Sequence, residues 1–317
     1  MPLPSNNVQL LGLPFARGQR NAGPSKAPDS LRAGGLEDVV RSQGFHFEDR
    51  GDVSLSEDEN EPTNSPRKEA TGRCLRKLFE RVRTTAASGD FVLNVGGDHS
   101  VGFATLMGMK SQYPDLCVIW VDAHGDCNTP ETSPSGNYHG MPAAHAMGWF
   151  KEQPPGFEWA TDLQYFNDCE VAFLGLRDVD QEERELLRTH SDVVVSDMHS
   201  VDRHGIHSEL ARIVKRLDPD GVRPLHVSFD IDACDPAIAP GTGTLARGGL
   251  NYRESHYILE YLTQHCRLVS LDIVEVDPTK DVSRHRMHGD HKAIRADGLT
   301  QYLALDLIRS ALGGTIL

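Results

Sequence analysis

Three ionisable residues occupy alternate positions in the segment CVIWVDAHGDCN. Asp122, His124 and Asp126 come directly after the apolar run 117–121. Alternate side chains of an extended chain point to the same side, so these three groups can converge. Two carboxylates that converge away from water repel each other and are costly to bury unless a cation compensates them. The spacing therefore indicates a cation site, and the competing interpretation is that one Asp caps a helix.

Ionisable residues also follow other apolar runs that have the character of strands. The expected strands are 8–13, 91–95, 117–121, 171–176, 192–196, 225–229 and 268–273. Five of these runs lead into His99, Asp122, His124, Asp126, Asp178, Asp180, Asp230, Asp232 and Glu275. Open α/β sheets bind ligands at the carboxyl ends of their strands. Several such clusters at one edge predict a metal site, because capping alone does not explain them.

The residue types in these clusters indicate which metal the edge would bind. Four carboxylates and two imidazoles, with no cysteine placed to ligate, form an oxygen-rich set that favours Mn²⁺ over Zn²⁺. Six ligands are too many for one catalytic ion with an open position. They indicate two ions bridged by shared carboxylates and a water molecule, whose lowered pKa yields a hydroxide nucleophile.

The elements that must position these groups are strands alternating with helices. Helical spacing of apolar residues occurs at Leu75, Leu78, Phe79 and Val82, and again at Leu210, Ile213, Val214 and Leu217. This alternation predicts a parallel sheet covered by helices on both faces. We expect a single domain over residues 1–317, with a polar loop at about 51–72.

Composition and charge limit the partners of the chain. Its 317 residues include 32 Lys and Arg against 46 Asp and Glu, which gives a net charge of −14. This balance disfavours nucleic acids and anionic membranes and suits a cationic small substrate. No apolar run approaches the ~18 residues of a membrane span, and the N-terminal segment lacks signal or transit features, so we expect a cytoplasmic protein. The six cysteines lack C-x-x-C pairing, which indicates reduced thiols.

Seven motifs, spread over nearly the whole chain, resemble the arginase branch of the ureohydrolases. They are GGDHS (96–100), DAHGDCN (122–128), SGNYHGMP (135–142), GLRDVD (175–180), SFDIDACDP (228–236), GTGT (241–244) and LDIVEVDP (271–278). The resemblance implies a three-layer α/β/α sandwich around a mostly parallel sheet, with the active site at the carboxyl ends of the strands. It also implies hydrolysis of L-arginine to L-ornithine and urea by a metal-bridging hydroxide, in a homotrimer that sometimes pairs into a hexamer.

The resemblance further implies a role for each residue of the metal site. One Mn²⁺ would be held by His99, Asp122, Asp126 and Asp230, and the other by Asp122, His124, Asp230 and Asp232. Asp126 would also hydrogen-bond the nucleophile. Glu275 would pair with the substrate guanidinium, and His139 would carry protons between solvent and the site.

Substrate choice depends on the end of the molecule far from the metals. The α-carboxylate of arginine needs neutral donors and its α-ammonium needs acids. By resemblance, the carboxylate would be bound by Asn128, Ser135 and Asn137, and the ammonium by Asp180 and Glu183, while Thr244 would line the guanidinium end. The alternatives are an enzyme for agmatine, a guanidino acid or formiminoglutamate, and a catalytically silent regulator or scaffold. The SGN and RDVD motifs disfavour the first alternative, and the complete set of catalytic groups disfavours the second.

Two segments depart from the family pattern, namely 153–168 and 283–292. In the second, His285, His288 and His291 recur among Arg and Lys, which indicates a solvated surface rather than another metal site. Cys234 closely follows the expected ligand Asp232, and we expect it to be a small buried residue without a redox role.

Overall fold

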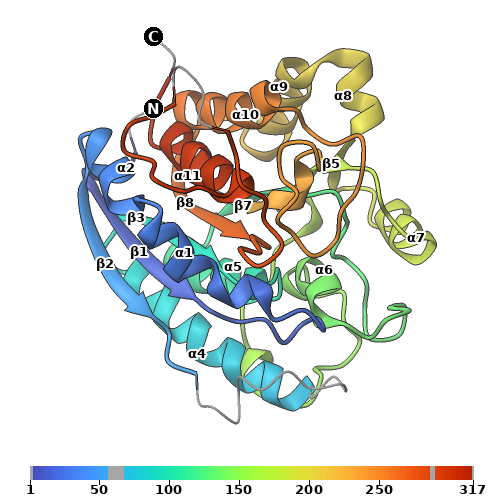
Figure 1. The fold of residues 1–317 in the computed structure, drawn as a ribbon. Coiled ribbons are helices and arrows are strands. Elements are labelled where there is room, and N and C mark those ends of the chain that lie inside the picture. The colour runs from blue at the N-terminus through green and yellow to red at the C-terminus, as the bar shows by residue number, and fades with distance from the viewer. Residues whose placement is uncertain (1–2, 56–67, 286–289, 316–317) are drawn as a thin grey trace.

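A parallel sheet of eight strands runs through the computed structural model, which describes residues 3–55, 68–285 and 290–315 (Figure 1). Its strand order is β2-β1-β3-β8-β7-β4-β5-β6, and every neighbouring pair is parallel. The strands are β1 (Asn7–Leu13), β2 (His46–Asp52), β3 (Phe91–Gly96), β4 (Cys117–Val121), β5 (Val171–Leu176), β6 (Val194–Asp197), β7 (Pro224–Asp230) and β8 (Arg267–Val274).

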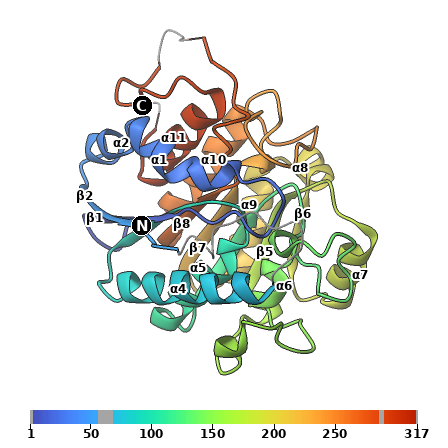
Figure 2. The ribbon, with the colours of Figure 1, turned by 60° about the horizontal axis from the view of Figure 1, so that its bottom comes forward.

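Helices cover both faces of this sheet, as Figure 2 shows. One face packs against α1 (Ala27–Ala33), α2 (Leu36–Ser42), α8 (Met198–His204), α9 (Ile206–Leu217), α10 (Tyr252–His265) and α11 (Leu299–Ala311). The other packs against α4 (Lys68–Ala86), α5 (Val101–Gln112) and α6 (Pro142–Ala146), while α7 (Gln181–Thr189) follows β5. The central strands are apolar throughout because both of their faces are buried. The predicted three-layer α/β/α architecture is confirmed.

The sequence missed one strand and misjudged one loop. All seven predicted strands are present, with ends that differ by at most two residues, whereas β2 was not predicted. Its sequence, HFEDRGD, is largely exposed at the sheet edge and so has no apolar pattern. The loop expected at 51–72 is wrong at its C-terminal end, because α4 already begins at Lys68. Residues 56–67 of that loop lie outside the described part of the chain.

The four central strands bring the candidate residues together. In the order β3-β8-β7-β4, the carboxyl ends of these strands lead into His99, Glu275, Asp232 and Asp122. Gly97 lets the loop after β1 approach the loop after β3, since a Cβ there would lie 1.6 Å from the carbonyl oxygen of Phe15. This close packing places residues that follow β1 beside the site.

Two smaller expectations concern membranes and thiols. Among the described residues, no helix combines the length and apolar character that crossing a membrane requires. None of the six cysteines is in a disulfide bond, and five of them are buried. The sequence, which lacks C-x-x-C pairing, predicts reduced thiols.

Candidate metal and substrate site

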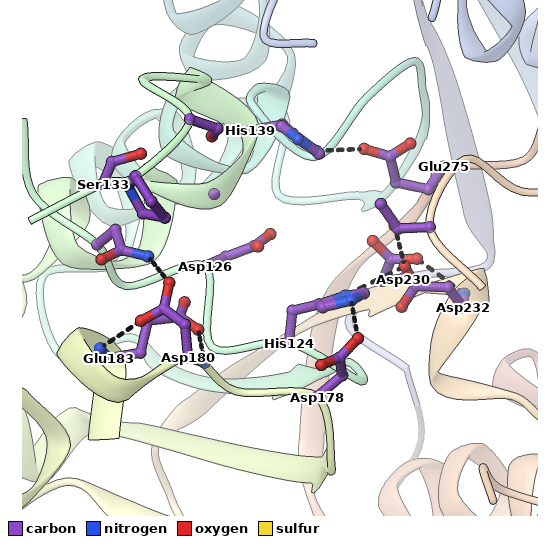
Figure 3. Close-up of a pocket in the computed structure, with 15 residues that line it drawn as sticks. His124, Asp126, Ser133, His139, Asp178, Asp180, Glu183, Asp230, Asp232 and Glu275 are labelled. Carbon is purple, nitrogen blue, oxygen red and sulfur yellow. Dashed lines mark hydrogen bonds and ion pairs between the residues drawn. The ribbon is translucent and has the colours of Figure 1, made fainter. Parts of the chain in front are cut away.

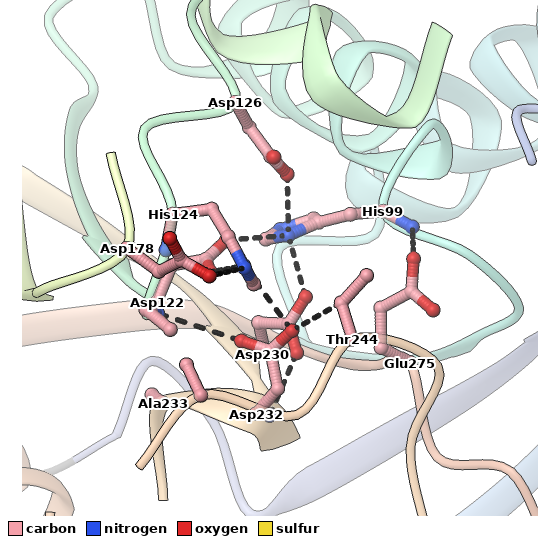
Figure 4. Close-up of polar contacts among 12 residues, drawn as sticks. His99, Asp122, His124, Asp126, Asp178, Asp230, Asp232, Ala233, Thr244 and Glu275 are labelled. Atoms are coloured by element: carbon pink, nitrogen blue, oxygen red, sulfur yellow. Dashed lines mark hydrogen bonds and ion pairs between the residues drawn. The ribbon is translucent and has the colours of Figure 1, made fainter. Parts of the chain in front are cut away.

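The six predicted metal ligands gather at the carboxyl ends of β3, β4 and β7 (Figure 4). Nδ1 of the buried His99 lies 3.0 Å from an oxygen of Asp122, 3.1 Å from one of Asp126 and 3.1 Å from one of Asp230. Three carboxylates from two different strand ends therefore surround one imidazole nitrogen.

The other nitrogen of His99 shows which ring nitrogen carries the proton. Nε2 of His99 lies 2.9 Å from Oγ of Ser228, and that hydroxyl donates to Asp272 at 3.4 Å. In the neutral ring, Ser228 therefore accepts from the Nε2–H of His99, which leaves Nδ1 with a lone pair. Nδ1 has no hydrogen bond although three carboxylate oxygens face it. The lone pair of Nδ1 and the three carboxylates cannot hydrogen-bond to one another, but together they can ligate a cation.

A second group of ligands shares Asp122 with the first. Nδ1 of His124 lies 3.3 Å from Asp122 and 3.3 Å from Asp232. The ligand atoms of His99, Asp122 and Asp126 lie within 4.8 Å of one another, and so do those of Asp122, His124 and Asp232. Two adjacent groups with a common carboxylate are the arrangement that a pair of bridged ions requires.

The electrostatics of these groups also fit cations. Burial and the neighbouring Asp122 raise the pKa of Asp126 to about 6. Burial alone would lower the pKa of His99 and His124, but the carboxylates around them raise both pKa values well above the usual range. The protein thus concentrates negative charge that only a cation or bound protons can balance. Divalent ions satisfy both this charge and the unpaired Nδ1 of His99.

Hydrogen bonds hold the ligand carboxylates in place. Asp122 accepts from the indole nitrogen of Trp120 at 3.0 Å, and Asp232 accepts from the hydroxyl of Thr244 at 2.8 Å. Arg177 donates to the carbonyls of Asp232 at 2.7 Å and Ala233 at 2.9 Å, which fixes the turn after β7. Such supporting contacts orient ligands before a metal binds.

Backbone strain coincides with the site. Asp126 and Glu275, with φ values of 46° and 59°, are the only residues other than glycine in the described chain with positive φ. This conformation is unfavourable for a residue with a Cβ and persists only where its surroundings enforce it. The amide of Glu275 donates to Gly97 at 2.9 Å, and the carbonyl of Asp126 accepts from Ala143 at 3.0 Å. Both strained residues line the cavity described below.

Glu275 lies opposite His139 beside the metal ligands. Nδ1 of His139 is 3.3 Å from Glu275, whose carboxylate also accepts from the backbone amide of His99 at 2.9 Å and from the side chain of Gln19 at 2.7 Å. Burial alone would lower the pKa of His139, but Glu275 raises it to about 9. Burial opposes ionisation of Glu275, yet His139 and the other donors keep its pKa below the usual value. Sequence reasoning missed Gln19, because no pattern links it to Glu275.

His139 and Glu275 are among the residues that line a cavity of about 260 Å³ (Figure 3). The predicted substrate residues that line it are Asn128, Ser135, Asp180, Glu183 and Thr244. Asn137 belongs to the same loop as Ser135 but does not line the cavity. Ser133 and Asp178 line it as well, and Asp178 lies 3.8 Å from Nε2 of His124.

The far end of the cavity is organised by the start of α7. Asp180 caps this helix by accepting from the amide of Glu183 at 2.8 Å, and the Glu183 carboxylate accepts from the amide of Asp180. The second oxygen of Asp180 accepts from the side-chain amide of Asn128 at 2.8 Å, and Asn128 in turn accepts from Thr132 at 2.8 Å. Burial and Asp126 raise the pKa of Glu183 to about 7. The acidic Asp180 and the neutral amide of Asn128 therefore lie side by side. The sequence analysis did not predict the contribution of Thr132.

Cys234, His285 and His291, which the sequence sets apart from the site, do not line this cavity. Cys234 is buried, its sulfur lies 3.2 Å from the hydroxyl of Ser255, and burial raises its pKa to about 12, which keeps it a thiol. His285 is exposed and His291 half-buried, whereas His288 lies outside the described residues.

Comparison with known proteins extends these findings. The model of the family described as "Arginase family" matches residues 6–313. A curated arginase of Plasmodium berghei is 39% identical over 331 residues, which cover 98% of this chain and 93% of the relative.

Solved structures give the same result. The native arginase of Bacillus caldovelox superposes with a TM-score of 0.86 at 31% identity, covering 98% of this chain and 99% of that one. The arginase of Entamoeba histolytica in complex with L-ornithine superposes with a TM-score of 0.83 at 26% identity, covering 99% and 100%. On the evidence of the family model and of full-length relatives, the chain belongs to the arginase family of hydrolases.

Proposed function

We propose that this protein hydrolyses the guanidinium group of L-arginine to give L-ornithine and urea, and that it uses two Mn²⁺ ions per chain. The observation that carries the proposal is the pair of ligand groups that share Asp122 at the floor of an acidic cavity. A carboxylate-rich set with two imidazoles favours Mn²⁺ over Zn²⁺. The Entamoeba relative was solved with L-ornithine, the proposed product.

The metal pair would be held by the six residues named from the sequence, which are His99, Asp122, His124, Asp126, Asp230 and Asp232. When bound, two such ions lower the pKa of a water molecule and supply hydroxide near neutral pH. Asp126 reaches both His99 and the cavity, so its carboxylate can accept a hydrogen bond from the nucleophile.

Glu275 and His139 act on the reacting end of the substrate. The anionic carboxylate of Glu275 is fully buried and fixed by three donors, so it can pair with a guanidinium in one orientation. His139 faces Glu275 through Nδ1, which leaves Nε2 to exchange protons with water and with the leaving amine. Thr244, hydrogen-bonded to Asp232, lines the same end of the cavity.

The opposite end binds the amino-acid part of the substrate. Asp180 and Glu183 provide negative charge for the α-ammonium, and Asn128 and Ser135 provide donors for the α-carboxylate. Asn137 does not line the cavity, so its role in binding the carboxylate stays a prediction from the sequence. A cationic and an anionic group of the substrate would thus each meet a complementary group.

The proposal is tested by measuring urea release from L-arginine and from agmatine with Mn²⁺-loaded protein. We expect hydrolysis of arginine with kcat/KM at least about tenfold above that for agmatine, because agmatine lacks the α-carboxylate. Equal or higher activity on agmatine would assign the chain to a different substrate. Absence of urea from every guanidino compound in folded, metal-loaded protein would favour a silent relative.

Three further features remain predictions from the sequence. They are the single catalytic domain over 1–317, assembly into a homotrimer or hexamer, and a cytoplasmic location. Mass measurement in solution tests the assembly.

A further inference from the structure

A row of hydrogen-bonded side chains lies behind the turn that carries His139. The turn Tyr138–Gly140 directly precedes α6, and the hydroxyl of Tyr138 lies 2.6 Å from Nδ1 of His145 on that helix. Nε2 of His145 lies 2.9 Å from the side-chain oxygen of Gln153. The amide nitrogen of Gln153 donates to the hydroxyl of Tyr165 at 2.8 Å. The row thus reaches the segment 153–168, which departs from the family pattern.

The far end of the row fixes the direction of every bond in it. Tyr165 donates its one hydroxyl proton to the carbonyl oxygen of Ala160 at 2.8 Å, so its oxygen must accept from Gln153. The side-chain oxygen of Gln153 then faces His145 and can only accept, which places the proton of His145 on Nε2. Nδ1 of His145 therefore accepts from Tyr138. Each polar atom along the row has a partner.

His145 is held as a neutral ring with its proton on Nε2. It is fully buried, and its ring stacks on Phe103 with centroids 3.9 Å apart and on Phe150 at 4.3 Å. Burial lowers the pKa of His145 to about 3, while Gln153 opposes the shift only in part. The neutral ring therefore presents a constant acceptor to Tyr138.

The backbone on either side of His139 is held by long hydrogen bonds. The amide of Gly140 reaches the carbonyl of Asn137 at 3.4 Å, and the amide of His139 reaches the carbonyl of Gly18 at 3.3 Å, both near the long limit of a hydrogen bond. Two shorter bonds involve the end of the turn: the amide of Met141 donates to the carbonyl of Tyr138 at 2.9 Å, and the amide of Asn128 donates to the carbonyl of Gly140 at 3.1 Å. The buried side chain of Tyr138, with its ring 4.9 Å from that of Phe157, anchors the turn in the aromatic core beside the backbone of His139.

We propose that His145 is a positioning residue, which accepts the hydroxyl proton of Tyr138 and thereby holds the turn with His139 facing Glu275. The inference rests on the proposed function, since it assigns His139 to proton exchange. His145 lies in the aromatic core and is absent from the lining of the cavity, so it acts through Tyr138 rather than on the substrate. Loss of this acceptor would remove the stabilisation that one hydrogen bond gives the turn. This loss corresponds to a roughly fivefold change in how often the turn opens and in kcat.

Two substitutions at His145 separate positioning from packing. In His145→Asn, Oδ1 takes the place of Nδ1 and can still accept from Tyr138, but the stacking on Phe103 and Phe150 is lost. In His145→Phe, the stacking is kept and the acceptor is lost. Both variants remove the donor to the side-chain oxygen of Gln153, so they differ in the acceptor and the ring alone.

The two variants are compared by thermal unfolding, by hydrogen–deuterium exchange of the peptide covering 137–141, and by kcat for arginine. We expect His145→Phe to unfold at a higher temperature than His145→Asn, yet to exchange about fivefold faster in 137–141 and to have about fivefold lower kcat. The exchange measurement is made on metal-free protein as well, so it does not depend on activity. Tyr138→Phe should reproduce the effects of His145→Phe on the turn.

Trp159→Phe is the matched control. It removes one side-chain hydrogen bond within the same aromatic cluster, from the Trp159 indole to the carbonyl of Gly72 at 3.0 Å, and neither partner belongs to the turn. It should lower the unfolding temperature without changing exchange in 137–141 or kcat. If kcat of the His145 variants follows their unfolding temperatures, or if exchange in 137–141 is unchanged in His145→Phe, the residue is structural only. Absence of urea release in the unmodified protein would instead refute the proposed function.

Discussion

Replacing Asp180 by Asn removes a negative charge from the far end of the cavity while keeping the shape of the residue. Asp180 makes two hydrogen bonds through its carboxylate. One oxygen caps α7 by accepting from the amide of Glu183, and the other accepts from the side-chain amide of Asn128. Asn is as good a helix cap as Asp, whereas Ala removes the cap at a cost of about 1 kcal/mol. Asp180→Asn therefore keeps the cap and tests the charge together with the bond from Asn128, because the new amide nitrogen cannot accept it. Asp180→Ala serves as the control for the cap.

The expected loss follows from the contact proposed with the α-ammonium. A hydrogen bond between charged groups contributes about 1.5 to 3 kcal/mol, so kcat/KM for arginine should fall about 10- to 150-fold in Asp180→Asn. The free energy of unfolding should change little in this variant and fall by about 1 kcal/mol in Asp180→Ala. Urea release and denaturant unfolding measure the two quantities.

A substrate analogue makes the test specific. The analogue of arginine that has hydrogen in place of the α-ammonium cannot contact Asp180, so its kcat/KM should be nearly equal in the unmodified protein and in Asp180→Asn. If the substitution impairs both substrates equally, Asp180 acts on the fold or on Asn128 and does not recognise the ammonium.

Three other predictions concern the reacting end of the site. His139→Ala should lower kcat by about 100-fold, and added imidazole should restore part of it; unchanged turnover at every pH would exclude a proton-transfer role. The pKa of His139 is raised from 6.5 to about 9, so its contribution to stability is full below about pH 6.5 and is lost as the pH rises through about 9. In metal-free protein, the unmodified chain should therefore have a higher free energy of unfolding in urea than His139→Asn at pH 6.5, and this difference should shrink as the pH rises to about 9. A difference that does not depend on pH would refute this. Arg177→Lys should lower the unfolding temperature and weaken metal retention, since Lys cannot reach the carbonyls of both Asp232 and Ala233 from one position; metal content after dialysis equal to that of the unmodified protein would contradict it.

The sequence predicted the fold well where periodicity reflects burial. Strands buried on both faces, such as β4, appear as uninterrupted apolar runs, and α9 has the spacing of a half-buried helix. β2 was missed because an edge strand exposed to solvent needs no apolar face. The start of α4 was missed because Lys68–Gly72 lacks apolar spacing and continues the polar composition of the residues before it.

The candidate site was predictable where it follows strand ends and not where it depends on distant loops. Asp122, His124 and Asp232 directly follow strands that the sequence shows clearly. Gln19 is 256 positions away from Glu275, and nothing local to it reveals the contact. His145 looks like an ordinary residue of a short apolar helix until the structure places Tyr138 and Gln153 on either side of it. Such partners are selected by tertiary packing, which a single sequence does not display.

The most direct test of the two-metal account is a titration of metal-free protein with Mn²⁺, in which bound metal and urea release from arginine are measured on the same samples. The account predicts no urea without metal and full activity at about two Mn²⁺ per chain, because two ligand groups share Asp122. Asp232→Asn, which alters only the group that contains His124, should lose one ion preferentially. Full activity of the unmodified protein with one ion or none per chain would contradict the account.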